Sequence, residues 1–209
     1  LMELQVPFSE PIADGPVILH ANQQSLHAGS TVDRCFEFAE AVSQRFDIPF
    51  VLMTYYNILF KFGVEDFADR MAAEGLRGAI VPDLPPEEAG DYLAAMARNQ
   101  LDPIFIFSPN TTDERMSLIA SRTGGFVYCV ARKGVTGAET SFTTEFEAYL
   151  TRCRAATDLP LALGFGVKDA ADVDFLRGQV DIAVIGTETL RVVDQGGVEA
   201  VRAFIEELR

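Results

Sequence analysis

Two carboxylates near the start of the chain have the types and spacing that acid–base chemistry needs. Glu3 lies within an apolar run at residues 1–6 that predicts a strand, and Asp14 lies in the proline- and glycine-containing loop that follows. A carboxylate in an apolar strand is unfavourable unless it is paired, protonated or used in a reaction. The two acids can converge on one mouth and act as general acid and base. The alternative is a rim acid in an ion pair and a turn former beside Gly15.

Glycine-containing turns near the end of the chain predict a phosphate site. Gly164-Phe165-Gly166 and Gly186-Thr187 each lie between a predicted strand and a predicted helix. The free N–H groups and the dipole at a helix start favour an anion. Glycine also occurs at such turns for conformational reasons alone. Glu188, directly after Thr187, would repel an anion unless it points away.

A polar loop at residues 132–141, with glycines at 134 and 137, follows the fifth predicted strand. Loops of this kind act as lids over active sites. Thr136 could hydrogen-bond a carboxylate such as Asp14, which makes it the candidate lid residue. A solvated connector is the alternative.

The elements that position these residues alternate strictly between strand and helix. Seven apolar strands are predicted, each followed by a helix, with no hairpin signals. Such alternation indicates a parallel sheet, either doubly wound or closed into a barrel. In a barrel, the polar and glycine residues at the strand ends gather on the face where such folds carry out chemistry. The strands are predicted at residues 1–6, 49–54, 78–82, 103–107, 126–131, 160–163 and 181–185, and helices at 17–27, 32–46, 64–73, 85–99, 144–155, 169–176 and 198–208, with another opening at Thr111 or Thr112.

Composition limits the class of protein and its partners. The 209 residues are 48% hydrophobic and no linker divides them, so residues 1–209 are predicted to form one domain with a sizeable core. The net charge of −14 argues against nucleic acid or an anionic membrane as a partner. No apolar run is long enough to span a bilayer, and no secretory leader is visible. Neither the three cysteines nor His20 and His27 have metal-site spacing, so no metal is predicted.

Several segments resemble the α subunit family of tryptophan synthase, the indole-3-glycerol-phosphate lyases. They are residues 2–16, which contain Pro-Phe-Ser-x-Pro-x-Ala-Asp-Gly-Pro, residues 132–139 and residues 164–167, together with 55–57 and Asp83. The resemblance covers essentially the whole chain and implies a (β/α)8 TIM barrel. Seven β/α units are one short of eight and the chain starts in mid-strand, so the family's first unit is expected to be missing. The barrel is then expected to have an open seam with two unpaired strand edges.

The resemblance also implies a reaction and the residues that perform it. The family cleaves indole-3-glycerol phosphate to indole and glyceraldehyde 3-phosphate by a retro-aldol reaction. Glu3 matches the general acid–base that protonates the indole ring carbon, and Asp14 matches the carboxylate that holds the indole N–H and stabilises the positive ring. The matches to the indole pocket or its neighbourhood are Ile18, Met53, Tyr55, Tyr128 and Phe165. Thr136 matches the lid threonine, and the matches to the phosphate site are Gly137, Gly166, Gly186 and Thr187.

Four positions depart from the family pattern: Gln5 stands where Gly is usual, Glu10 where Asp is usual, Thr187 where Ser is usual, and Glu188 where a small residue is usual. The change at Gln5 is expected to alter the backbone near Glu3, and Glu188 is expected to affect phosphate affinity.

The resemblance implies a partner, the tryptophan synthase β subunit, in an α2β2 heterotetramer in the cytoplasm. Pyridoxal phosphate is expected in that partner, which would consume the indole, and no cofactor is expected in this chain. Two alternatives stay open. One is a catalytically weak paralogue that serves as an allosteric or structural partner of a β subunit, and the other is a different phosphosugar TIM-barrel enzyme.

Overall fold

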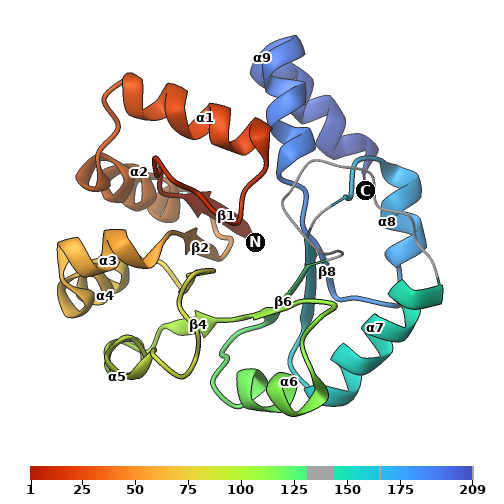
Figure 1. Ribbon diagram of the computed structural model, residues 1–209. Coiled ribbons are helices and arrows are strands. Elements are labelled where there is room, and N and C mark those ends of the chain that lie inside the picture. Colours follow the sequence, from red (N-terminus) through yellow and green to blue (C-terminus); the bar gives the residue numbers. More distant parts are fainter. Residues whose placement is uncertain (131–143, 165, 209) are drawn as a thin grey trace.

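Short parallel strands form the inner wall of the molecule in the computed structural model, which describes residues 1–130, 144–164 and 166–208 (Figure 1). The strands form two sheets, ordered β1-β2-β3-β4 and β5-β6-β7-β8. Every ladder between neighbours in these sheets is parallel. The strands are β1 Met2–Gln5, β2 Phe50–Met53, β3 Gly78–Ile80, β4 Asp102–Ile104, β5 Ile106–Phe107, β6 Val127–Val130, β7 Leu161–Gly164 and β8 Ile182–Ala183.

Helices surround the strands on the outside (Figure 1). They are α1 Pro16–His27, α2 Val32–Arg45, α3 Tyr56–Phe62, α4 Val64–Ala73, α5 Gly90–Arg98, α6 Asp113–Ala120, α7 Thr144–Ala156, α8 Ala170–Leu176 and α9 Thr187–Glu207. Within the described ranges, none of these helices has the length and apolar content needed to cross a membrane.

The seven predicted strands are all present, and the fourth is divided in two. The segment predicted as one strand at 103–107 is interrupted at Phe105, so that β4 pairs with β3 and β5 pairs with β6. The Phe105 carbonyl accepts a hydrogen bond of 3.0 Å from the Tyr128 amide. The two sheets are therefore joined through one nearly continuous segment of chain.

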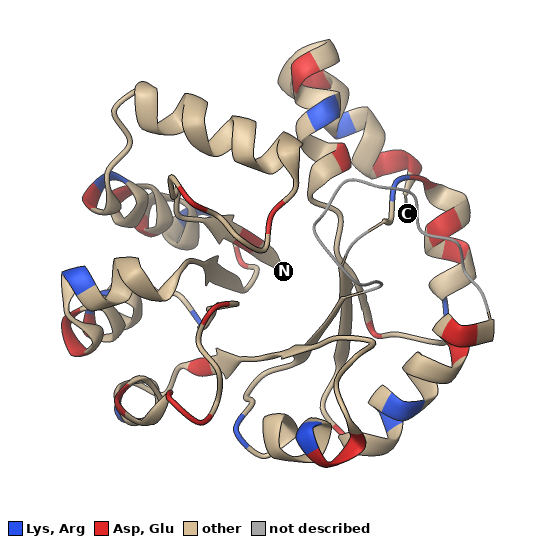
Figure 2. Ribbon diagram, in the orientation of Figure 1, with Lys and Arg blue, Asp and Glu red and all other residues tan. Residues whose placement is uncertain are grey.

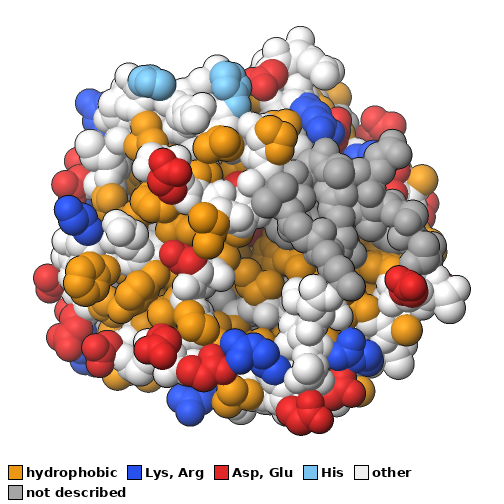
Figure 3. All heavy atoms as spheres, viewed as in Figure 1, with side chains coloured by type: hydrophobic (Ala, Val, Ile, Leu, Met, Phe, Trp, Pro, Cys, Tyr) orange, Lys and Arg blue, Asp and Glu red, His pale blue; other side chains and the backbone are white. Residues whose placement is uncertain are grey.

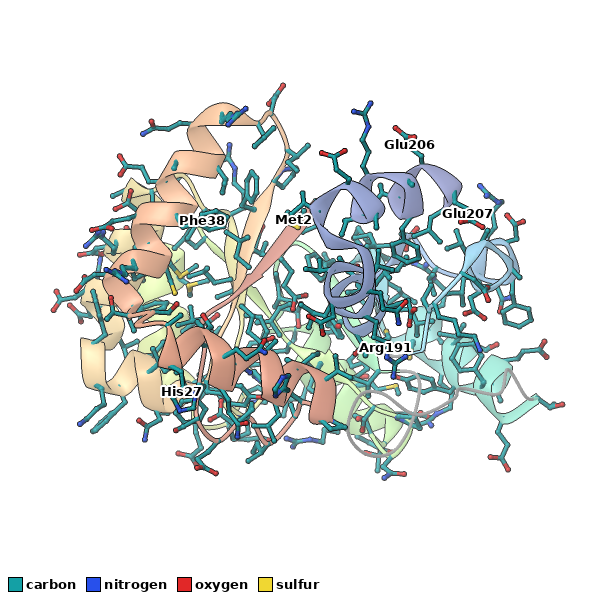
Figure 4. The ribbon with its side chains drawn as sticks, turned by 90° about the horizontal axis from the view of Figure 1, so that it is seen from above. Met2, His27, Phe38, Arg191, Glu206 and Glu207 are labelled. Atoms are coloured by element: carbon teal, nitrogen blue, oxygen red, sulfur yellow. The ribbon has the colours of Figure 1, made fainter. Side chains whose placement is uncertain are left out.

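The barrel wall is open between β1 and β8. β1 pairs with β2 and β8 pairs with β7, and no ladder joins β1 to β8 in the part of the chain that the structure describes. This confirms the predicted seam. Outside it, α1 and α9 pack against each other (Figure 1). Seen from above, Met2 at the start of β1 lies beside α9 (Figure 4).

Several helix boundaries follow from side-chain caps. Thr31 accepts from the Arg34 amide at the start of α2, and Thr112 accepts from the Arg115 amide at the start of α6, each at 3.3 Å. These caps satisfy amides that have no partner within the helix. The cap at Thr112 confirms one of the two residues predicted to open that helix.

Three helices differ from the prediction. α3 was not predicted, and its first amide, that of Tyr56, donates to Asp83 at 2.8 Å, so the cap comes from a residue 27 positions away. α5 begins at Gly90 instead of residue 85, because the two prolines start a turn in which the Glu88 amide donates to the Pro85 carbonyl at 3.0 Å. α9 begins at Thr187, before the helix predicted at 198–208, and includes a break at Gly197, whose φ is +70°.

The strand register decides which side chains face the inside of the barrel. Glu3 is in register with Val51, and Gln5 is in register with Met53. Val51 belongs to an apolar cluster inside the barrel, together with Ile80, Ile104, Phe126 and Ala162. Because side chains alternate along a strand, Glu3 and Gln5 share one face of β1, and Leu4 packs on the opposite face against the outer core. Most other charged residues lie on the outer helices and loops (Figure 2).

Candidate active site

One cavity of about 1500 Å³ brings together residues that follow the ends of different strands. Figure 3 shows a hollow with hydrophobic side chains around it near the centre of this face. Most of the predicted site residues line the cavity, namely Glu3, Asp14, Ile18, Met53, Tyr128, Gly166, Gly186 and Thr187. They come from β1, the loop before α1, α1, β2, β6, the residues after β7 and the start of α9, so distant parts of the sequence form this cavity.

Glu3 is a carboxyl group in an apolar environment. Burial raises the pKa of Glu3 to about 7, and the negative charge of Asp14 contributes to the rise. Within the described ranges, no hydrogen bond counters this shift. A carboxyl with such a pKa is partly protonated at neutral pH, which makes it a suitable proton donor.

Asp14 is held by two hydrogen-bond donors on one of its oxygens. Its Oδ2 accepts from Gln5 Nε2 at 2.7 Å and from the Tyr55 hydroxyl at 3.0 Å. Burial raises the pKa of Asp14 above its ordinary value, and these two hydrogen bonds oppose the rise. The environment of Asp14 therefore favours the ionised form more than that of Glu3 does.

Tyr55 supports the loop that carries Asp14. Its side chain is fully buried, and its ring stacks on Phe8 with 5.1 Å between the ring centroids. The Tyr55 hydroxyl accepts from the Ala13 amide at 3.1 Å while it donates to Asp14. Burial and the charge of Asp14 raise the pKa of Tyr55, so the hydroxyl keeps its proton. Tyr55 thus lies behind Asp14 and does not line the cavity itself.

Tyr128 lies on the inner face of β6, where it is in register with Ile106 and Ala162. Burial raises the pKa of Tyr128, and the negative charges of Glu3 and Asp14 raise it further. Tyr128 is therefore close enough to both acids to sense their charge. Gly164, the last residue of β7, leaves room for the ring, because a Cβ atom at this position would overlap it. Tyr128, Ile18 and Met53 supply apolar surface near the two acids, which suits a flat aromatic ligand.

The start of α9 forms the other end of the cavity. Gly186 precedes the helix without a side-chain cap, and a Cβ atom there would meet nothing within 4 Å. The first amides of a helix have no partner within it, so the space beside Gly186 and Thr187 suits an anion. Gly166 lines the same cavity with a φ of +104°, a conformation that favours glycine.

Glu188 is paired within α9. Its carboxylate accepts from Arg191, one turn further along the helix, at 3.0 Å. Figure 4 labels Arg191 on α9. The pair partly compensates the charge that Glu188 brings to the start of the helix.

Three of the predicted site residues lie outside the described ranges, and two residues near the site were not predicted. Thr136, Gly137 and Phe165 lie outside the described residues. Gln5 and Gly164 were not predicted as site residues. The two-residue spacing of Gln5 from Glu3 on one strand was a usable signal, whereas nothing local marks Gly164. Among the described residues, no group of three or more His, Cys, Asp and Glu is arranged to hold a metal ion.

This arrangement is typical of one class of protein, the parallel β/α barrel enzymes: two carboxyl groups, apolar side chains and the start of a helix line one cavity at the mouth of the barrel. A sequence model of the family "Tryptophan synthase alpha chain" matches residues 1–208. The chain belongs to this family, which confirms the predicted resemblance and the TIM-barrel fold class.

Individual relatives support the assignment along the whole chain. The chain is 65% identical to a tryptophan synthase alpha chain of Syntrophotalea carbinolica over 209 residues, which are all of this chain and 83% of that protein. It is 64% identical to that of Desulforapulum autotrophicum over 208 residues, which cover 82% of that protein. Among solved structures, tryptophan synthase of Mycobacterium tuberculosis superposes with a TM-score of 0.92 at 34% identity, over 99% of this chain and 78% of that chain.

The contact between Gly164 and Tyr128 gives a prediction about packing. Gly164→Ala should lower the melting temperature by several degrees, because overpacking of this kind costs about 1–3 kcal/mol. Differential scanning calorimetry measures this effect. Gly90→Ala is the matched control, since a Cβ atom at Gly90 meets nothing within 4 Å. In a Tyr128→Ala background the cost of Gly164→Ala should largely disappear; an equal cost with and without the ring would contradict the contact.

Proposed function

We propose that Glu3 and Asp14 are the acid–base pair with which this chain, a lyase of the tryptophan synthase α type, cleaves indole-3-glycerol phosphate to indole and glyceraldehyde 3-phosphate in tryptophan biosynthesis. The observation that carries this proposal is the contrast between two acids in one cavity. Glu3 has a pKa of about 7, whereas Asp14 receives two hydrogen bonds that favour its charge. Different environments of this kind divide the roles of proton donor and fixed negative charge.

In the proposed reaction Glu3 donates its proton to the ring carbon that carries the glycerol side chain. The ring becomes cationic. The Asp14 carboxylate accepts a hydrogen bond from the ring N–H and stabilises the positive charge where it develops. The carbon–carbon bond then breaks. Its electron pair returns to the ring, which leaves as indole, and the side-chain hydroxyl becomes the aldehyde as its proton passes to the carboxylate of Glu3.

The remaining predicted residues hold the two ends of the substrate in this proposal. The indole ring lies against Ile18, Met53, Tyr128 and Phe165, and Tyr55 acts through Asp14. The phosphate binds at Gly137, Gly166, Gly186 and Thr187, and Thr136 is the lid residue. The open space at Gly186 and the pairing of Glu188 with Arg191 support the phosphate assignment.

A β subunit is the proposed partner of this chain, in an α2β2 heterotetramer that holds pyridoxal phosphate in the partner. The support is a solved structure with a TM-score of 0.90 and 32% identity, over 99% of this chain and 85% of that chain, which is described as the tryptophan synthase α2β2 complex of Pyrococcus furiosus. We further propose that residues 1–209 form one barrel domain and that the enzyme is cytoplasmic.

Glu3→Gln tests the proposed acid. The amide cannot donate a proton to carbon, so turnover should fall by at least about 10³-fold while substrate affinity stays nearly unchanged. The measurement is indole release from indole-3-glycerol phosphate, with and without a β subunit, and calorimetric titration of the substrate. Glu37→Gln, on the exposed face of α2, is the matched control and should retain full turnover. Retained turnover in Glu3→Gln would remove Glu3 from the mechanism.

The pKa of Glu3 predicts a pH dependence. The acid must be protonated to act, so kcat/KM, which reports the pKa values of the free enzyme, should be highest below pH 7 and fall about tenfold per pH unit above it. The charge of Asp14 raises the pKa of Glu3, so Asp14→Asn should lower that pKa. Carboxyl-carbon NMR can follow the titration of Glu3 in the inactive Asp14→Asn variant. A pKa of Glu3 near 4.5 in the unmodified chain would contradict this electrostatic account.

The proposed phosphate site can be tested at Gly186. Gly186→Asp puts a carboxylate at the start of α9, where it should compete with a phosphate and weaken indole-3-glycerol phosphate binding by about tenfold or more. Calorimetric titration with the substrate and with its dephosphorylated form, indole-3-glycerol, separates charge from shape. Equal weakening of the two ligands would count against a phosphate site at Gly186.

A further inference from the structure

Gln5 is the one polar neighbour of Glu3 on the inner face of β1. It lies two residues after Glu3, in register with Met53, and lines the same cavity. Its Nε2 donates to Asp14 Oδ2 across nine positions of sequence at 2.7 Å. The strand that carries the proposed acid therefore also carries a donor to the proposed charge-stabilising carboxylate.

We infer that Gln5 is a positioning residue for the proposed reaction: together with Tyr55 it fixes the orientation of the Asp14 carboxylate and favours its ionised form. The inference rests on the proposed function of Asp14. It adds to that function a residue that acts on the reaction through Asp14.

The geometry separates the two oxygens of Asp14. The Gln5 amide and the Tyr55 hydroxyl both donate to Oδ2, at 2.7 Å and 3.0 Å. Within the described ranges, Oδ1 accepts no hydrogen bond from the protein. Two donors from different elements, β1 and the start of α3, restrict rotation of the carboxylate more than one donor does. In the proposed reaction, Oδ1 is the oxygen that accepts a hydrogen bond from the indole N–H.

The chemistry of the donors matters as much as their position. Glu3 and Gln5 on β1, Tyr55 after β2 and Tyr128 on β6 face Asp14, and Asp83 acts on Tyr55. No lysine or arginine from the described residues contributes to the pKa of Asp14. A cation there would favour the Asp14 carboxylate, but it would also favour the carboxylate form of Glu3 and remove the proton that the reaction needs. A neutral amide favours the charge of Asp14 by a short-range hydrogen bond without that second effect.

The test compares Gln5→Met, which keeps the length of the side chain and removes the donor, with the unmodified chain. The α2β2 complex is assayed for indole release from indole-3-glycerol phosphate across pH. Loss of one hydrogen bond to a charged group should lower kcat about tenfold, with a smaller change in KM. The acid limb of the kcat profile, which reports ionisation of Asp14, should move to higher pH by about one unit.

Further variants separate positioning from general structural damage. Gln5→Glu keeps the shape of the side chain and brings a second carboxylate against Asp14, so the acid limb of its kcat profile should move to higher pH by more than that of Gln5→Met. If Gln5→Met does not fold, Gln5→Glu serves as the test variant. Gln44→Met is the matched control, because Gln44 also donates to a carboxylate, Glu40 at 3.1 Å, but on the outside of α2. Its kcat and acid limb should be unchanged.

The outcomes distinguish this inference from the proposed function. An unchanged acid limb in both Gln5 variants, with Asp14→Asn inactive, would overturn the role of Gln5 and leave that of Asp14 intact. An active Asp14→Asn variant would overturn the proposed function itself. In an Asp14→Asn background, Gln5→Met should have no further effect on residual turnover; an additive loss would show that Gln5 acts elsewhere.

Discussion

The cavity depends on one constraint: two carboxyl groups share a poorly solvated space and must stay in different protonation states. Each negative charge raises the free energy of the other, so only one is readily ionised near neutral pH. The protein resolves this with neutral donors, since Gln5 and Tyr55 both serve Asp14 and burial leaves Glu3 with a pKa of about 7. The proposed division into proton donor and fixed charge follows from this asymmetry.

The fold supplies the asymmetry by drawing on different elements. The parallel register of β1 against β2 places Glu3 level with Val51 in the apolar interior, and Gln5 one layer nearer the mouth, level with Met53. Asp14 comes from the loop before α1, which Tyr55 supports from the end of β2. Since no single element carries both the acid and its counterpart, their separation is set by the packing of the whole barrel half.

Much of this arrangement could be predicted from the sequence, because the alternation of strands and helices is a local signal and the family resemblance implied the barrel. The apolar runs gave the parallel strands, and the position of Asp14 after the first of them gave its convergence with Glu3. The contact from Gln5 to Asp14 and the placement of Tyr55 behind Asp14 depend on loop conformation and rotamers, which no spacing rule specifies. α3 was missed for a similar reason, since its cap, Asp83, comes from a distant strand end.

The two ends of the cavity place opposite electrostatic demands on a chain with a net charge of −14. At one end the proposed reaction needs a negative charge beside a ring that becomes cationic, which Asp14 supplies. At the other end the proposed phosphate site must bind an anion despite the overall repulsion. In this proposal the backbone amides at the start of α9 attract the phosphate over a short range, and Arg191 pairs with Glu188, the nearest acid. A substrate with an aromatic ring at one end and a phosphate at the other then has only one favourable orientation, because reversing it would place the phosphate against Asp14.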